Sequence, residues 1–86
     1  KGGDCYYGDS VEGISHGKGI YIWTDGERYE GDFVNGQLTG KGVFFYKNGE
    51  RYEGDFVNGC KEGYGTMYYP DGRYDTGRWH DDNFMG

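Results

Sequence analysis

Short runs of alternating residue types follow one another along the chain. The run YEGDFV, found twice, alternates aromatic or glycine positions with charged ones, and KGVFFYK is rich in aromatic and β-branched residues. A period of two is typical of β-strands, and the Asp-Gly or Asn-Gly pairs between runs favour tight turns. The pattern predicts seven strands in meander order, at 6–11, 18–24, 29–34, 41–47, 52–57, 64–70 and 75–80.

The runs recur with a period of 23 residues. The letters GERYEGDFVNG stand at 26–36 and again at 49–59, and glycines repeat in columns, of which one is Gly8, Gly31, Gly54 and Gly77. A fixed period of this length is typical of stacked repeat proteins, in which a unit is stable only beside its neighbours.

The period divides the chain into three full units, 6–28, 29–51 and 52–74, and a partial unit, 75–86. In the partial unit Asp75 replaces a tyrosine and Asp82 replaces a glycine. We expect an all-β fold that forms one domain over residues 1–86: a single-layer antiparallel meander sheet of stacked 23-residue β-hairpin repeats, an open and curved solenoid.

The Asn48-Gly49 pair predicts a two-residue turn, and this turn fixes the register. It pairs Phe45 with Tyr52, Val43 with Gly54, and Lys41 with Phe56. One face then carries Ile20, Ile22, Tyr29, Phe33, Val43, Phe45, Tyr52, Phe56, Tyr68 and Trp79. The opposite face carries Tyr21, Trp23, Phe44, Tyr46, Met67 and Tyr69, mixed with Glu30, Asp32, Glu53 and Asp55.

The first of these faces also bears the glycine column, which would let the sheet curl toward it, so we expect that face to be concave. Strands about 4.8 Å apart, two per unit, place copies of one position about 10 Å apart. Identical aromatics therefore cannot stack directly and must touch through intervening residues or a ligand. Aromatics on an uncovered layer usually mark an interaction surface; the alternative is that they mainly hold the solenoid together.

Composition narrows the classes of partner. The chain has 86 residues, 19 of them glycine, and a net charge of −6 with no run of Lys or Arg. Nucleic acid and anionic lipid are therefore unfavourable partners. No apolar stretch reaches the roughly 20 residues that span a bilayer. Because the sequence starts inside a repeat pattern, without Met, we expect a piece of a longer chain.

Catalytic and metal-binding patterns are not evident. In GISHGKG the lysine is followed by Gly19 and not by Ser or Thr, which argues against a phosphate-binding loop. His16 and His80 lie nearly three units apart, and HDDN at 80–83 is best explained as a solvated end. We expect no enzyme, no cofactor and no metal. Cys5 and Cys60 lie more than two units apart, so we expect free thiols, which suit a reducing compartment.

The repeated residues suggest a family. Tyr-x-Gly-x-aromatic-x-x-Gly, then Gly-x-Gly, then Asp/Asn-Gly stands here as YEGDFVNGQLTGKGVFFYKNGER and YEGDFVNGCKEGYGTMYYPDGRY. This pattern resembles the MORN repeat (membrane occupation and recognition nexus) over nearly the whole chain, in about three and a half repeats. The first unit has Ser10 where Phe33 and Phe56 stand, and the last keeps only Gly77 and Trp79. The resemblance implies stacked hairpins that bind proteins, organise membrane contacts or self-associate.

We therefore expect a non-catalytic interaction or self-association scaffold, located in the cytoplasm, with membrane or cytoskeletal association as an addition. The partner is expected to be a protein, a peptide or a second copy of the chain. Membrane-lipid association, an accessory role beside a larger lipid-kinase-like or other enzyme, and glycan binding are the alternatives. The residues expected to line the partner-binding groove are Tyr29, Phe33, Tyr52, Phe56 and Trp79.

Overall fold

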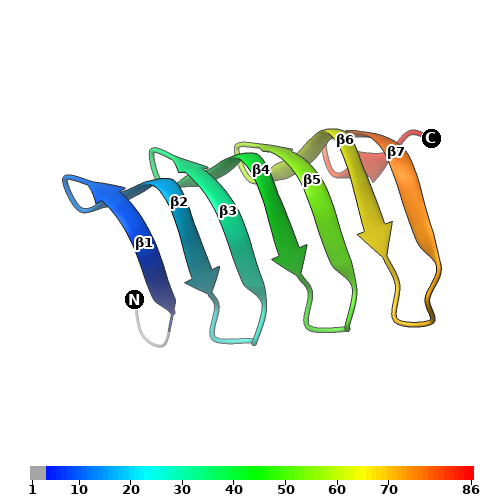
Figure 1. The fold of residues 1–86 in the computed structure, drawn as a ribbon, viewed down its shortest axis with the longest axis horizontal. Helices are drawn as coiled ribbons and strands as arrows, with labels where there is room; N and C mark the ends of the chain where they lie inside the picture. The colour runs from blue at the N-terminus through cyan, green and yellow to red at the C-terminus, as the bar shows by residue number, and fades with distance from the viewer. Residues whose placement is uncertain (1–3) are drawn as a thin grey trace.

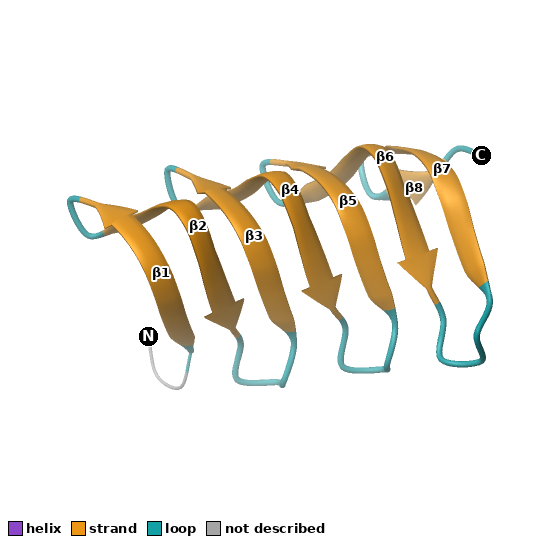
Figure 2. Cartoon of the chain, in the orientation of Figure 1, coloured by secondary structure: helices purple, strands orange, loops and turns teal. Residues whose placement is uncertain are grey.

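The computed structural model describes residues 4–86, which form one antiparallel sheet of eight strands in chain order. Figure 1 shows the strands side by side in a single open layer, and Figure 2 shows the short loops that join them. The strands are β1 (Cys5–Val11), β2 (Ile14–Ile22), β3 (Arg28–Val34), β4 (Gln37–Phe45), β5 (Arg51–Val57), β6 (Cys60–Tyr68), β7 (Tyr74–His80) and β8 (Asn83–Phe84). The predicted all-β meander of stacked hairpins is confirmed. The short strand β8 was not predicted.

The loops between repeats contain three residues, where the sequence predicted two. In the loop after β4, the Tyr46 N–H donates to the Glu50 carbonyl at 2.9 Å, and the Gly49 N–H donates to the Tyr46 carbonyl at 3.1 Å. Gly49 has a φ of 95°, and Asn48 Oδ1 accepts a hydrogen bond from the Glu50 N–H at 2.9 Å. A tight turn followed by a left-handed glycine is a common three-residue hairpin loop. The same loop follows β2 and β6.

This extra residue makes the predicted register wrong by one position. Tyr52 pairs with Phe44 and not with Phe45, and Gly54 pairs with Gly42 and not with Val43. Because side chains alternate between faces, a one-residue slip moves every side chain of one strand to the other side. Tyr21, Trp23, Phe44, Tyr46, Met67 and Tyr69 therefore share a face with Tyr29 and Tyr52, while Ile20, Ile22, Val43, Phe45 and Tyr68 lie on the opposite face.

The two-residue turn occurs at the other end of each hairpin. Asn35 and Gly36 have φ of 51° and 83°, and Val34 pairs directly with Gln37. This is the Asn-Gly turn whose twist matches the flanking strands. The strand after it begins at Gln37, four positions before the predicted start at 41, and β2 and β6 likewise begin earlier than predicted.

These turns also join one repeat to the next. The Gly36 N–H donates to the Ser15 carbonyl and the Gly59 N–H to the Leu38 carbonyl, both at 2.8 Å. In the partial unit, Asp82 has a φ of 72° in the place of the glycine, and its N–H donates to the Lys61 carbonyl at 3.1 Å. The replacement therefore keeps the turn and its contact with the preceding repeat.

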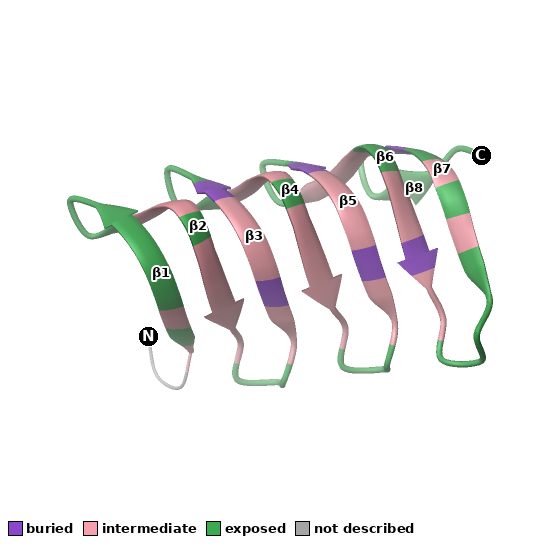
Figure 3. Ribbon diagram, in the orientation of Figure 1, coloured by how far each residue is buried: buried purple, intermediate pink, exposed green. Residues whose placement is uncertain are grey.

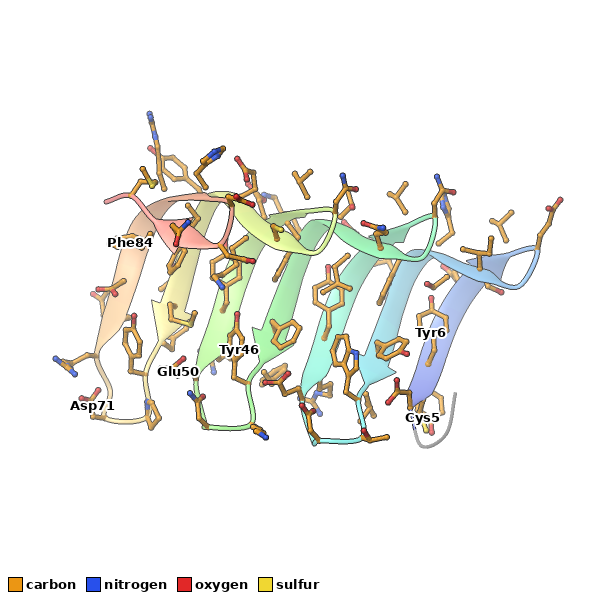
Figure 4. The ribbon with its side chains drawn as sticks, turned by 180° about the vertical axis from the view of Figure 1, so that it is seen from behind. Cys5, Tyr6, Tyr46, Glu50, Asp71 and Phe84 are labelled. Atoms are coloured by element: carbon orange, nitrogen blue, oxygen red, sulfur yellow. The ribbon has the colours of Figure 1, made fainter. Side chains whose placement is uncertain are left out.

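A bulge bends each hairpin toward one face. The register shifts between Gly31 and Phe33, and the Asp32 carboxylate accepts a hydrogen bond from the Lys41 N–H at 3.2 Å where the ladder is interrupted. Asp32 also pairs with the Lys18 ammonium. Bulges bend the strand that carries them. In Figures 1 and 4 the two-residue turns curl toward the face on which Tyr6 and Tyr46 lie, so this face is concave.

The core is a row of aromatic rings on the concave face. Tyr29 and Tyr52 are 0% exposed, Phe33 is 2%, and Phe56 is 3%. Tyr29 meets Phe33 of its own repeat and Phe56 of the next, each edge-on with ring centroids 5.2 Å apart. Contact through intervening residues was predicted, and the structure confirms it. Figure 3 shows the buried positions as bands on β3, β5, β6 and β7.

Candidate partner-binding face

The concave face carries two parallel sets of aromatic side chains. The first, which we call the buried row, consists of Tyr29, Phe33, Tyr52, Phe56 and Trp79. The second, which we call the aromatic row, lies nearer the three-residue loops and is partly buried; its members are Tyr21, Trp23, Phe44, Tyr46 and Tyr69.

The buried row depends on glycines that leave space for the tyrosines. The Tyr52 ring lies across Gly65 so closely that a Cβ there would stand 2.0 Å from the tyrosine oxygen. The Tyr29 hydroxyl donates to the Asp32 carbonyl at 2.9 Å, and the Tyr52 hydroxyl donates to the Asp55 carbonyl at 3.2 Å. Burial, followed by the nearby Asp32 and Asp55 carboxylates, raises the pKa of Tyr29 and of Tyr52 to about 12. Both side chains are therefore neutral, hydrogen-bonded parts of the core.

The five residues predicted to bind a partner are the members of the buried row. The structure brings them together on the concave face, as expected, but none is more than 6% exposed. Their contacts are with one another; for example, Trp79 meets Tyr52 at 5.3 Å and donates its Nε1–H to the Gly65 carbonyl at 3.0 Å. Direct contact of these five with a partner stays a prediction. Their burial gives them a packing role in the free chain.

The aromatic row offers ring surface to solvent. Trp23 lies 4.7 Å from Tyr21 and 5.2 Å from Phe44, and Phe44 lies 4.7 Å from Tyr46, as centroid distances. These rings cross from the hairpin of one repeat to the next and rest on the buried row. The sequence predicts these rings on the face opposite to Tyr29 and Tyr52, because Asn48-Gly49 fits a two-residue turn. The three-residue loop of the structure puts them on the same face as Tyr29 and Tyr52.

Lys61 shows how this face accommodates a cation. Its Nζ lies 5.5 Å from the ring centre of Tyr46, 5.8 Å from Tyr52 and 5.6 Å from Trp79. It also donates to the Tyr46 hydroxyl at 3.0 Å and lies 3.5 Å from an oxygen of Asp82. The lysine side chain is only 12% exposed. Rings within about 6 Å attract an ammonium through their electron-rich faces. Sequence reasoning missed this lysine because Leu38 and Ser15 hold its place in the other repeats.

The convex face is different in character. Arg28 stacks over Phe45 at 4.2 Å and pairs with Glu30 at 3.1 Å, and Arg51 repeats this arrangement over Tyr68 with Glu53. Phe45 and Tyr68 are thus each covered by a guanidinium group whose charge is matched within the chain, whereas Tyr7, Tyr64 and Tyr74 of this face are 61% exposed. The concave face differs because its partly exposed rings rest on a buried core, and it is the candidate binding surface for that reason.

The cysteines and histidines, which could serve in a disulfide, a metal site or catalysis, lie far apart in the sheet. Cys5 lies on β1 and Cys60 on β6, and both are free thiols. His16 lies on β2, whereas His80 lies at the end of β7, where its Nδ1 is 2.7 Å from Glu62. This hydrogen bond raises the pKa of His80. Among residues 4–86 no group of three or more His, Cys, Asp or Glu side chains could hold a metal ion. In the same part of the chain, no helix is long and apolar enough to cross a membrane.

The fold and the face together define a repeat protein built from stacked β-hairpins with an aromatic core on one side. The model of the MORN repeat matches the chain three times, at residues 6–28, 29–51 and 52–72. The chain belongs to the MORN repeat family, whose members are repeat modules often linked to membrane or protein interaction and are generally not catalysts. No match was found among curated proteins.

Proposed function

We propose that the chain is a non-catalytic scaffold module that binds another protein along its concave face. The observation that carries this proposal is the aromatic row, in which Tyr21, Trp23, Phe44 and Tyr46 form an unbroken series of ring contacts and, like Tyr69, remain partly exposed. Large rings held rigidly beside a buried core contribute binding energy at low entropic cost. The family supports an interaction role but does not choose the partner.

The charge of the chain favours a protein over a membrane as the partner. The net charge is −6, and the ammonium groups of Lys18 and Lys41 are paired with Asp32 and Asp55. Anionic lipid headgroups attract clusters of basic residues and repel an acidic surface. We therefore propose a protein and not a lipid surface as the partner. We also propose a cytoplasmic location, on the separate ground that Cys5 and Cys60 are free thiols, which suit a reducing compartment.

Site-specific photo-crosslinking in cell extract tests the proposal. A photoreactive phenylalanine analogue replaces Tyr46 in the aromatic row, and a control carries it at Tyr74, which is 61% exposed and lies on the convex face. Because the concave face is the binding surface, we expect a defined protein adduct at position 46 and not at position 74. Equal labelling at the two positions would contradict the proposal. An adduct at 46 that contains the chain itself would identify self-association through this face.

A further inference from the structure

A line of carboxylates runs beside the aromatic row. Glu27 pairs with Trp23, and Glu50 with Tyr46, across the three-residue loops, so each glutamate shares the face of its aromatic neighbour. Figure 4 shows Tyr46 and Glu50 on the same face at the two sides of one loop. Asp4 occupies the equivalent position one repeat earlier and accepts a hydrogen bond from the Tyr21 hydroxyl at 3.1 Å.

At the last repeat an arginine replaces the glutamate of this line of carboxylates. Arg73 stands at the position of Glu50, but its Nε turns to Asp71 at 2.8 Å. Asp75 supplies the carboxylate there, 2.7 Å from the Tyr69 hydroxyl. Within residues 4–86, neither Glu27 nor Glu50 forms an ion pair. Each repeat therefore places a carboxylate beside the aromatic row, at Asp4, Glu27, Glu50 and Asp75.

Lys61 shows what this surface accepts. The ammonium of Lys61 lies within 6 Å of the centres of three rings, and its side chain is almost fully covered. An ammonium is thus compatible with close packing on these rings when a carboxylate stands nearby, as Asp82 does at 3.5 Å. A partner's lysine or arginine would find the same combination of ring and carboxylate at Trp23 and Glu27, which pair across the preceding loop.

The distance between neighbouring repeats of the solenoid matches the spacing of side chains along an extended peptide. Two strands per repeat, about 4.8 Å each, separate equivalent carboxylates by about 9.6 Å. A polyproline-type helix completes three residues in about 9.3 Å, so its every third side chain returns to the same side at nearly this spacing. The turn of an α-helix, about 5.4 Å, does not match this step.

We propose that the aromatic row binds an extended cationic segment of a partner protein, with lysine or arginine at about every third residue and apolar residues between. This inference rests on the proposed function and names the chemistry of its partner. A second copy of the chain does not fit this face, because its own carboxylates would meet those of the row. Like charges across an interface oppose association.

The test uses a fluorescein-labelled peptide of about twelve residues, a length that spans the long axis of the sheet at about 3.1 Å per residue. That axis measures 39 Å and runs along the stack of repeats (Figure 1). The peptide repeats Lys-Leu-Pro. Two further peptides carry glutamate or acetyl-lysine in place of lysine. Fluorescence anisotropy at low and physiological salt should show saturable binding of the lysine peptide alone, weakened by salt.

Two double variants with equal changes of charge locate the binding. Glu27→Gln with Glu50→Gln removes carboxylates beside the aromatic row, while Glu30→Gln with Glu53→Gln removes the same charge from the convex face of the same repeats. We expect the first to lose about five- to tenfold in affinity for the lysine peptide and the second to change little. Circular dichroism checks that both variants keep the fold.

Equal binding of the lysine and glutamate peptides would overturn the inference, as would equal losses in the two double variants. The photo-crosslinking experiment at position 46 shows whether such a result contradicts only the cationic partner or also the proposed scaffold function. If the lysine peptide does not bind but a protein adduct forms at position 46, the scaffold proposal stands and the cationic partner is wrong. If no adduct forms either, both are wrong.

Discussion

At the scale of single residues, the ring of each buried tyrosine packs on a glycine of the next strand. The Tyr29 ring covers Gly42, as the Tyr52 ring covers Gly65, and in each case a Cβ would stand within 2.2 Å of the tyrosine oxygen. The register predicted from the sequence places Gly54 opposite Val43. The structure assigns that space to Gly42, Gly65 and the Tyr52 side chain instead.

Gly65→Ala should therefore destabilise the chain by about 1–3 kcal/mol, because the Tyr52 ring must leave its position. Gly72→Ala is the comparison. Gly72 has a φ of 96°, but no atom lies within 4 Å of its added Cβ. Its cost is conformational only, on the order of 1 kcal/mol. Thermal unfolding followed by circular dichroism should show the lower Tm for Gly65→Ala, and the reverse order would mean that the tyrosine is not packed on this glycine.

Alkaline pH should unfold the chain through the same tyrosines. The pKa of Tyr29 and of Tyr52 is about 12 in the folded chain, against the ordinary value of 10.0. The unfolded chain therefore releases these protons first. The stability is fully present below about pH 10 and is lost as the pH rises through about 12.

Tyr52→Phe should shift this alkaline unfolding transition to higher pH, since one of the two ionisable groups is gone. Tyr7→Phe changes a tyrosine that is 61% exposed and should leave the transition in place. Absorbance of tyrosinate near 295 nm and circular dichroism, recorded in one titration, report ionisation and unfolding together. Tyrosines that ionise fully near pH 10 while the sheet persists would contradict the burial.

At the scale of elements, the loops decide what the sequence could predict. The alternation of residue types and the 23-residue period predicted the strands and their order, because both depend only on local pattern. The register depends on loop conformation. Asn48-Gly49 fits either a two-residue turn or the last two positions of a three-residue loop, and the choice moves Phe44 from one face to the other. The three-residue loop places the aromatic row beside the predicted binding residues, where it packs against them. The sequence alone therefore could not predict that these residues are buried.

The last hairpin covers the end of the core. The Phe84 ring lies 4.9 Å from that of Trp79, and the Arg78 N–H donates to the Gly86 carbonyl at 3.3 Å. The Trp79 side chain, 6% exposed, therefore owes part of its burial to β8.

Phe84→Ser should expose Trp79 and shift its fluorescence to longer wavelength. The chain has two tryptophans, so the measurement uses a Trp23→Phe background in which Trp79 is the only emitter. Met85→Ser is the control, because Met85 is 65% exposed. A shift equal to that of the control would show that β8 does not cover the end of the stack.

At the scale of the whole molecule, one curved layer divides its two faces between different tasks. On the convex face Arg28 pairs with Glu30 and Arg51 with Glu53, so these charges are matched within the chain. On the concave face the buried row holds the repeats together and the aromatic row stays available, with carboxylates beside it. This division explains how a single layer can be stable without a second sheet while large rings of the aromatic row remain partly exposed.

The central claim is that the buried row maintains the fold while the aromatic row is dispensable for it. Thermal unfolding of Tyr52→Ala and Tyr46→Ala tests this claim most directly, since both remove a tyrosine from the concave face on either side of the same loop. Removal of the fully buried Tyr52 ring should cost about 3–5 kcal/mol and abolish or sharply lower the cooperative transition, as expected for a large core side chain. Tyr46→Ala should keep a transition within a few degrees of the parent chain. A Tm of Tyr52→Ala equal to or higher than that of Tyr46→Ala would contradict the assignment of the buried row, and not the aromatic row, to the core.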